Sequence, residues 1–173
     1  MTFDLYVNPA ARAVIDAEEL PVPGPLDYHR TVPGYAATPL LELPRTAERL
    51  GVARVLLKDE AHRLGLPSFK MLGASWATAF AVRRQWLPDA EGILSPSRLG
   101  ELLPSRAGRR LVAATDGNHG RGVARMAALM GIECLVFVPA GLAESRIRAI
   151  ESEGAVVRVV DGGETLARQT GLL

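Results

Sequence analysis

The sequence predicts an α/β protein built on a parallel sheet. From residue 110 onward, short apolar runs and amphipathic stretches alternate in the order strand, helix, strand, helix, strand. A helix between two strands is the usual crossover between parallel strands, so a doubly wound sheet is expected. The 173 residues, 48% hydrophobic and 23% charged, are enough for one domain with a core or for two partial domains.

Composition also narrows the class of protein. Twenty basic residues against nineteen acidic ones give a net charge of +1, which offers no footprint for nucleic acid or for an anionic membrane. No apolar run approaches the roughly 20 residues that span a bilayer, and no signal peptide is recognisable. The single cysteine, Cys134, lies in an apolar run and is expected to be a buried structural thiol. We therefore expect a cytoplasmic protein with no metal site and neither nucleic acid nor membrane as a partner.

The first half of the chain is the less regular part. Residues 1–45 carry seven prolines, which predict extended chain and turns rather than a long helix. A helix is expected at Pro44–Leu50, because a proline suits a first helical position, and a buried strand at 53–58. A longer helix at 71–84 has small residues in its first turns, which let backbone or ligand approach closely. A short helix is predicted at 97–103.

The second half has a stronger pattern. Residues 111–114 read as a buried strand, 115–122 as a polar glycine-rich loop, and the next residues as a helix that continues to Met130 and ends at Gly131. A strand at 133–138, a helix at 142–153 and a strand at 155–160 follow. Residues 164–169 are predicted to begin one more helix.

The loop at 115–122 directs backbone N–H groups at an anionic ligand. Its glycines are spaced G-x-x-G-x-G, whereas a dinucleotide-binding loop has G-x-G-x-x-G, so a nucleotide is the weaker interpretation. In a second interpretation Asn118 bonds a ring hydroxyl of a cofactor and the backbone receives a substrate carboxylate. In a third, Asp116 or Asn118 merely caps the helix. The loop alone leaves these open.

Lys70 has two interpretations as well. It stands among apolar neighbours at the junction of a loop with the helix at 71–84. Such a lysine is either a surface charge whose stem packs on its neighbours or an amine kept for imine chemistry.

The two segments together resemble a known family. Residues 63–75, RLGLPSFKMLGAS, and 114–124, ATDGNHGRGVA, are similar to segments of the pyridoxal-phosphate enzymes of fold type II, the tryptophan-synthase-β type. The resemblance covers about residues 30–165 and implies a parallel three-layer α/β/α sheet. It implies pyridoxal 5'-phosphate as cofactor, held covalently by Lys70 and contacted by Asn118, with Phe69 part of the cofactor-binding string. It also implies that an amino-acid substrate meets Thr115, Asp116, Gly117 and His119.

Within this family the strings most resemble diaminopropionate ammonia-lyases. Threonine dehydratases usually carry serine where this chain has Asp116. The resemblance implies α,β-elimination of 2,3-diaminopropionate to pyruvate and ammonia. Lys70 would be the base on one face of the substrate, and Asp116 the base on the other. The alternatives are a serine/threonine dehydratase-like enzyme and a non-catalytic fragment that needs a partner chain.

Part of the family pattern has no counterpart here. Relatives bind the cofactor phosphate with a glycine-rich loop downstream of the G-N-H segment, and the glycine pair at 162–163 is expected to be only a turn. We therefore expect residues 1–70 to belong to an incomplete large domain, 71–160 to form a small open-sheet domain, and 161–173 to be a truncated end. The chain is expected to bind the cofactor weakly and to turn over poorly, and a full-length relative to be a homodimer.

Overall fold

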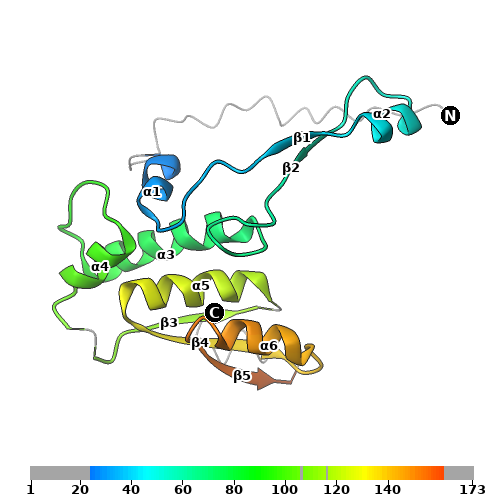
Figure 1. The fold of residues 1–173 in the computed structure, drawn as a ribbon. Helices are drawn as coiled ribbons and strands as arrows, with labels where there is room; N and C mark the ends of the chain where they lie inside the picture. Colours follow the sequence, from blue (N-terminus) through cyan, green and yellow to red (C-terminus); the bar gives the residue numbers. More distant parts are fainter. Residues whose placement is uncertain (1–23, 106, 116, 162–173) are drawn as a thin grey trace, which may run out of the picture.

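The structure is a computed structural model, and it describes residues 24–105, 107–115 and 117–161 (Figure 1). The helix predicted at 164–169 and the candidate base Asp116 lie outside the described residues. The described part contains a parallel sheet covered by helices, and an arm that extends from it.

The parallel sheet predicted for the second half is confirmed. Strands β3 (Arg110–Ala114), β4 (Glu133–Pro139) and β5 (Val156–Val160) are adjacent in this order, and both pairs are parallel. The register aligns Val112 with Leu135 and Leu135 with Val156. The central strand β4 is buried along its middle five residues, as its continuous apolar sequence requires.

The two crossover helices lie on the same face of this sheet. Helix α5 (Asn118–Met130) connects β3 to β4, and α6 (Glu144–Glu151) connects β4 to β5. Gly120 of α5 lies against both Val136 of β4 and Ile150 of α6, so close that an added Cβ would be 3.1 Å from the Val136 side chain. Because the strand order advances in one direction, right-handed crossovers place both helices on one side.

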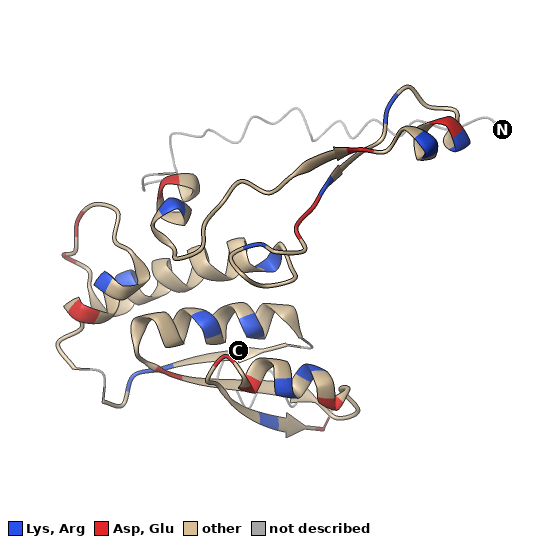
Figure 2. Cartoon of the chain, in the orientation of Figure 1, with Lys and Arg blue, Asp and Glu red and all other residues tan. Residues whose placement is uncertain are grey.

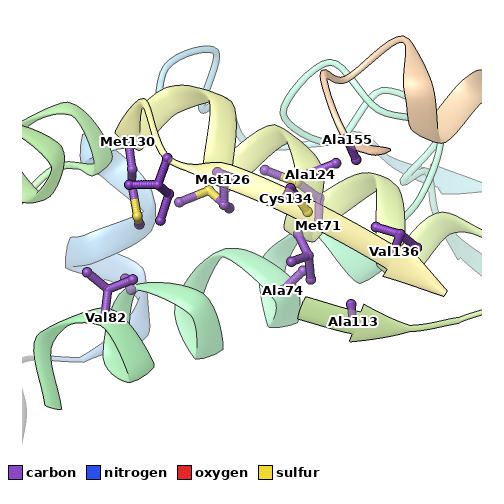
Figure 3. Close-up of a cluster of buried hydrophobic side chains, with 14 of the residues drawn as sticks. Met71, Ala74, Val82, Ala113, Ala124, Met126, Met130, Cys134, Val136 and Ala155 are labelled. Carbon is purple, nitrogen blue, oxygen red and sulfur yellow. The ribbon is translucent and has the colours of Figure 1, made fainter. Parts of the chain in front are cut away.

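A second layer of helices packs on α5. Helices α3 (Lys70–Trp86) and α4 (Pro96–Leu102) both contact it, and buried methionines from α3 and α5 fill the interface (Figure 3). Ala74 and Gly122 allow the close approach, because a Cβ on Gly122 would lie 2.7 Å from that of Ala74. The prediction that small residues at the start of α3 admit a neighbouring backbone is therefore confirmed at Ala74.

A helix within the proline-rich segment was not predicted. Helix α1 (Pro25–Thr31) begins at a proline, whose missing N–H is harmless in a first helical turn, and contains no other. It docks on α3: the His29 ring and the Leu72 carbonyl are hydrogen-bonded at 2.9 Å, and Tyr28 meets Trp76 edge to face. The expectation of only extended chain and turns is therefore wrong for these residues.

The arm consists of β1 (Leu40–Glu42), α2 (Pro44–Leu50) and β2 (Leu56–Lys58), and it projects from the helical layers (Figure 1). The predicted helix Pro44–Leu50 is confirmed, but the predicted buried strand at 53–58 is wrong. The chain forms a strand only at the last three of those residues, which pair antiparallel with β1 and are exposed. Three-residue strands and their long-range pairing leave too little pattern in the sequence to be recognised.

Cys134 is buried in β4, as predicted, and burial raises the pKa of its thiol to about 11. Among the described residues, no helix is both long and apolar enough to span a membrane. No group of three or more metal-ligating side chains occurs in that part of the chain.

Candidate functional site

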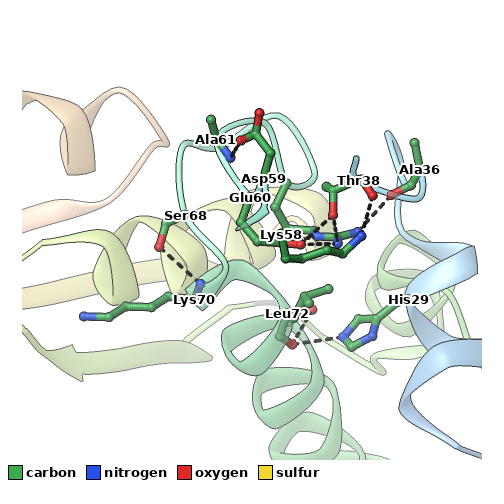
Figure 4. Close-up of polar contacts among 12 residues, drawn as sticks. His29, Ala36, Thr38, Lys58, Asp59, Glu60, Ala61, Ser68, Lys70 and Leu72 are labelled. Carbon is green, nitrogen blue, oxygen red and sulfur yellow. Dashed lines mark hydrogen bonds and ion pairs between the residues drawn. The ribbon is translucent and has the colours of Figure 1, made fainter. Parts of the chain in front are cut away.

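The Ser68-Phe69-Lys70 string lies where the loop after β2 enters α3. Lys70 is the first residue of that helix, and its backbone N–H donates to the Ser68 hydroxyl at 3.2 Å. The Lys70 side chain extends away from Thr38, Lys58 and Glu60, which belong to a polar cluster at the base of the arm (Figure 4). Phe69 is 64% exposed, so the structure does not pack it into the core.

The polar cluster at the base of the arm holds the loop that leads to Lys70. Arg63 is buried and donates to the Glu60 carboxylate, to Thr38 Oγ1 and to the Ala36 carbonyl. These hydrogen bonds from Arg63 are the largest of the effects that hold the pKa of Glu60 at about 2, below its usual value of 4.5. Lys58 donates to the Thr38 carbonyl.

The glycine-rich segment after β3 is shorter as a loop than predicted. Helix α5 begins at Asn118, so residues 118–122 are its first turns rather than loop. Thr115 Oγ1 accepts from the backbone N–H groups of Gly117 at 3.2 Å and of Gly120 at 3.3 Å. The threonine thus takes the role of capping this helix start, and the first helical residue is the asparagine of the G-N-H string.

Lys70 and Asn118 meet at one open pocket of about 300 Å³. It lies where the start of α3, the start of α5 and the first turns of α6 converge, and its lining residues are Lys70, Gly117, Asn118, Arg121, Ser145, Arg146 and Ala149. Two segments that are far apart in the sequence therefore form a common site. The structure does not place Phe69, Thr115 or His119 in this lining, and His119 is exposed.

Arg121, Ser145 and Arg146 were missed by the sequence analysis. Arg121 lies one helical turn after Asn118, on the same face of α5, and this spacing was the one local signal for it. Ser145 and Arg146 come from α6, whose position beside α5 is a long-range result of sheet formation. Figure 2 shows basic residues on α5, on α6 and at the start of α3.

A buried carboxylate lies behind the pocket. Glu153, after the end of α6, accepts from Arg121 Nη2 at 2.7 Å and from Arg125 Nε at 2.5 Å. Burial raises the pKa of Glu153, but hydrogen bonds from Arg125 and Arg121 outweigh burial and lower that pKa below its ordinary value. The carboxylate is therefore charged. Its hydrogen bonds link two turns of α5 to the segment between α6 and β5.

The residues of the pocket fit an anionic carbonyl compound. A primary amine, Lys70, can attack an aldehyde, and the amide of Asn118 can bond a hydroxyl beside it. Arginine side chains and the N-terminal end of α5 favour negative charge. Pyridoxal phosphate has an aldehyde, a ring hydroxyl and a phosphate, so the donor set suits it.

Comparison with known proteins agrees with this chemistry. The family model described as "Pyridoxal-phosphate dependent enzyme" matches residues 32–172. Diaminopropionate ammonia-lyase of Escherichia coli K12 is 38% identical over 136 residues, which are 78% of this chain and 33% of that protein. The enzyme of the same name from Salmonella typhimurium LT2 is 35% identical over 140 residues, 79% of this chain and 34% of that protein.

The fold agrees with a solved structure. The crystal structure of the Escherichia coli enzyme in complex with D-serine superposes with a TM-score of 0.76 at 35% identity. That match covers 86% of this chain and 37% of the other. The chain thus spans about a third of the length of the curated relatives it matches. By its family match and by its fold, the chain belongs to the pyridoxal-phosphate-dependent enzymes.

Proposed function

We propose that this chain is the cofactor-lysine part of an ammonia-lyase that acts on 2,3-diaminopropionate. The observation that carries the proposal is the convergence of Lys70 and Asn118 on one cationic pocket. The identity to diaminopropionate ammonia-lyases, 38% over 136 residues, supports this substrate over that of other family members. The products would be pyruvate and ammonia.

In this proposal Lys70 and Asn118 hold the cofactor, and Phe69 flanks the lysine. The bound cofactor supplies an electron sink for the carbon that loses its proton. Once it no longer holds the cofactor, the Lys70 amine would be free to take the α-proton on its face of the substrate. Asp116 is proposed as the base on the opposite face, which would let the enzyme use both mirror-image substrates.

The start of α5 is proposed to receive the substrate carboxylate. Thr115, Gly117 and His119 are its candidate contacts, since backbone N–H groups at a helix start favour an anion. His119 is exposed on this helix and is proposed as a hydrogen-bond donor rather than as a base.

The arm supports the proposed division of the chain. Six of its large aliphatic side chains are between 41% and 65% exposed: Leu40, Leu41, Leu50, Val52, Leu56 and Leu57. We infer that residues 1–70 belong to a larger domain whose remainder corresponds to the other two thirds of the relatives, with 71–160 as the small domain. The whole protein would be a cytoplasmic homodimer.

Substrate profiling tests this proposal and its alternatives. The purified chain is supplied with pyridoxal phosphate, and pyruvate or 2-oxobutyrate is measured with 2,3-diaminopropionate, serine and threonine. Preference for diaminopropionate that is lost in Lys70→Ala supports the proposal. Faster turnover of serine or threonine favours a dehydratase instead. No turnover of any of them, with Lys70 still modified by the cofactor, favours a fragment that needs a partner chain.

A further inference from the structure

Arg121 lines the pocket, and its guanidinium is hydrogen-bonded to Glu153, which is not one of the lining residues. Its Nη2 donates to Glu153, whose side chain is 5% exposed, while the Arg121 side chain remains 20% exposed. Its Nε–H is buried and finds no acceptor among the residues that the structure describes. A guanidinium has five N–H donors, so Glu153 satisfies only part of this one.

The charges around Glu153 do not cancel. One buried carboxylate is shared by two guanidiniums, those of Arg121 and Arg125, so the cluster keeps an excess positive charge. Lys70 adds positive charge to the pocket lining. Helix α5 directs its N-terminal end to the same place, which favours an anion there.

We propose that Arg121 binds an oxyanion of the ligand in this pocket, and that Glu153 is the positioning residue that orients it. The proposal rests on the proposed function for the identity of the ligand, but the oxyanion site itself can be tested without cofactor. The oxyanion is either the phosphate of the cofactor or the carboxylate of the substrate, because a guanidinium binds both through paired hydrogen bonds.

Inorganic phosphate is the first probe. The melting temperature of the chain is measured against phosphate concentration at constant ionic strength, for the wild type and Arg121→Gln. We expect phosphate to raise the melting temperature of the wild type, and its apparent affinity to fall about 10- to 100-fold in Arg121→Gln, the loss expected for a charged hydrogen bond. If Arg121→Gln does not fold by circular dichroism, Arg121→Lys replaces it, since it keeps the charge but not the paired donors.

Arg148→Gln is the matched control. Arg148 is an exposed arginine of α6, paired with Glu144, and its replacement removes the same charge outside the pocket. Phosphate should raise the melting temperature of Arg148→Gln with the same apparent affinity as in the wild type. Equal weakening in Arg148→Gln and Arg121→Gln, or no response to phosphate in the wild type, would overturn the proposal.

Glu153→Gln tests the positioning role by the sign of its effect. If Glu153 only contributes negative charge, its neutralisation strengthens phosphate binding. If it orients Arg121, phosphate binding weakens. We expect weakening, and a tighter site would refute the positioning role.

Labelling of Lys70 identifies the source of the oxyanion. Pyridoxal phosphate and pyridoxal, which lacks the phosphate, are each reduced onto the protein with borohydride, and Lys70 modification is quantified. If Arg121→Gln lowers the modification of Lys70 by pyridoxal phosphate but not by pyridoxal, the oxyanion that Arg121 binds is the cofactor phosphate. If cofactor labelling is unchanged, but 2,3-diaminopropionate releases the unreduced cofactor from Lys70 more slowly relative to ethylenediamine in a separate experiment without borohydride, the oxyanion is the substrate carboxylate. No difference in either comparison would contradict the proposal. Absence of Lys70 labelling in the wild type would count against the proposed function and leave the phosphate result to stand by itself.

Discussion

At the scale of single residues, the buried polar groups divide into those with partners and those without. Arg63 and Glu153 are both buried and charged, and each is paired through several hydrogen bonds. Removal of one partner from such a pair strongly destabilises the fold, because the other charge is left buried without a counter-charge. Both lie beside segments of the candidate site, so they stabilise the fold where Lys70 and Asn118 must be held.

Because of Glu60, the free energy of unfolding should depend on pH below about pH 4.5. Its pKa is about 2 in the folded chain and near 4.5 otherwise, so its contribution is complete above about pH 4.5 and is lost as the pH falls to 2. With allowance for solvent screening, the contribution is about 1–3 kcal/mol. Urea unfolding of the wild type and Glu60→Gln should differ at pH 7 and converge toward pH 2. Glu101→Gln, at an exposed ion pair, should parallel the wild type, and a constant difference for Glu60→Gln would contradict this role.

Tyr28, unlike Arg63 and Glu153, has a buried polar group without a hydrogen-bond partner among the described residues. Its hydroxyl is buried, burial raises its pKa above the ordinary value, and no described residue offers it a hydrogen bond. Tyr28→Phe removes the unsatisfied hydroxyl and keeps the ring against Trp76. The free energy of unfolding should stay equal or rise by about 1 kcal/mol. A loss of that size in denaturant unfolding would show that the hydroxyl has a partner.

At the scale of elements, the contact between α3 and α5 places both halves of the candidate site. Lys70 begins one helix and Asn118 the other, and the helices approach closely at Ala74 and Gly122. A side chain at Gly122 would separate them, because the surrounding core has no space for it.

Gly122→Ala should therefore destabilise the chain by roughly 1–3 kcal/mol. Gly73→Ala, on α3, is the matched control. No atom lies within 4 Å of its added Cβ, and it should stabilise the helix by about 0.5–1 kcal/mol. Thermal or denaturant unfolding of both variants measures the difference, and equal effects would show that the contact tolerates a methyl group.

The elements also show which parts of the fold were predictable. The strands and helices from residue 110 onward follow from local periodicity, since β4 is one continuous apolar run and α5 ends at Gly131. The exposed strands β1 and β2 do not follow from it, because their apolar residues face no core among the described residues.

The placing of Lys70 and Asn118 in one pocket agrees with the resemblance to the family. Arg146 and Glu153 reach that place only through the packing of α6, which no local pattern encodes.

At the scale of the whole molecule, the arm and the sheet differ in their environment. The strands of the arm are three residues long, paired with each other and exposed, whereas β4 is the buried centre of its sheet. An isolated two-stranded ribbon is only marginally stable in water. The exposed aliphatic residues of the arm agree with a chain that spans about a third of the length of its relatives.

Hydrogen exchange should reveal this difference. In the chain by itself, amides of β1 and β2 should exchange by local opening, much faster than those of β4, which should open only with global unfolding. Mass spectrometry of peptic peptides resolves the two regions. Equal protection of the arm and β4 would contradict the inference that the arm belongs to a larger domain.

Modification of the two lysines of the chain tests whether the pocket at the starts of α3 and α5, which Lys70 and Asn118 line, binds the cofactor. Lys58 is the only other lysine in the sequence, and its amine is engaged by the Thr38 carbonyl. The chain is incubated with pyridoxal phosphate, reduced with borohydride and mapped by mass spectrometry. Selective modification of Lys70, weakened in Asn118→Ala, is the predicted result. Equal modification of Lys58 and Lys70, or none of either, would show that this pocket does not bind the cofactor.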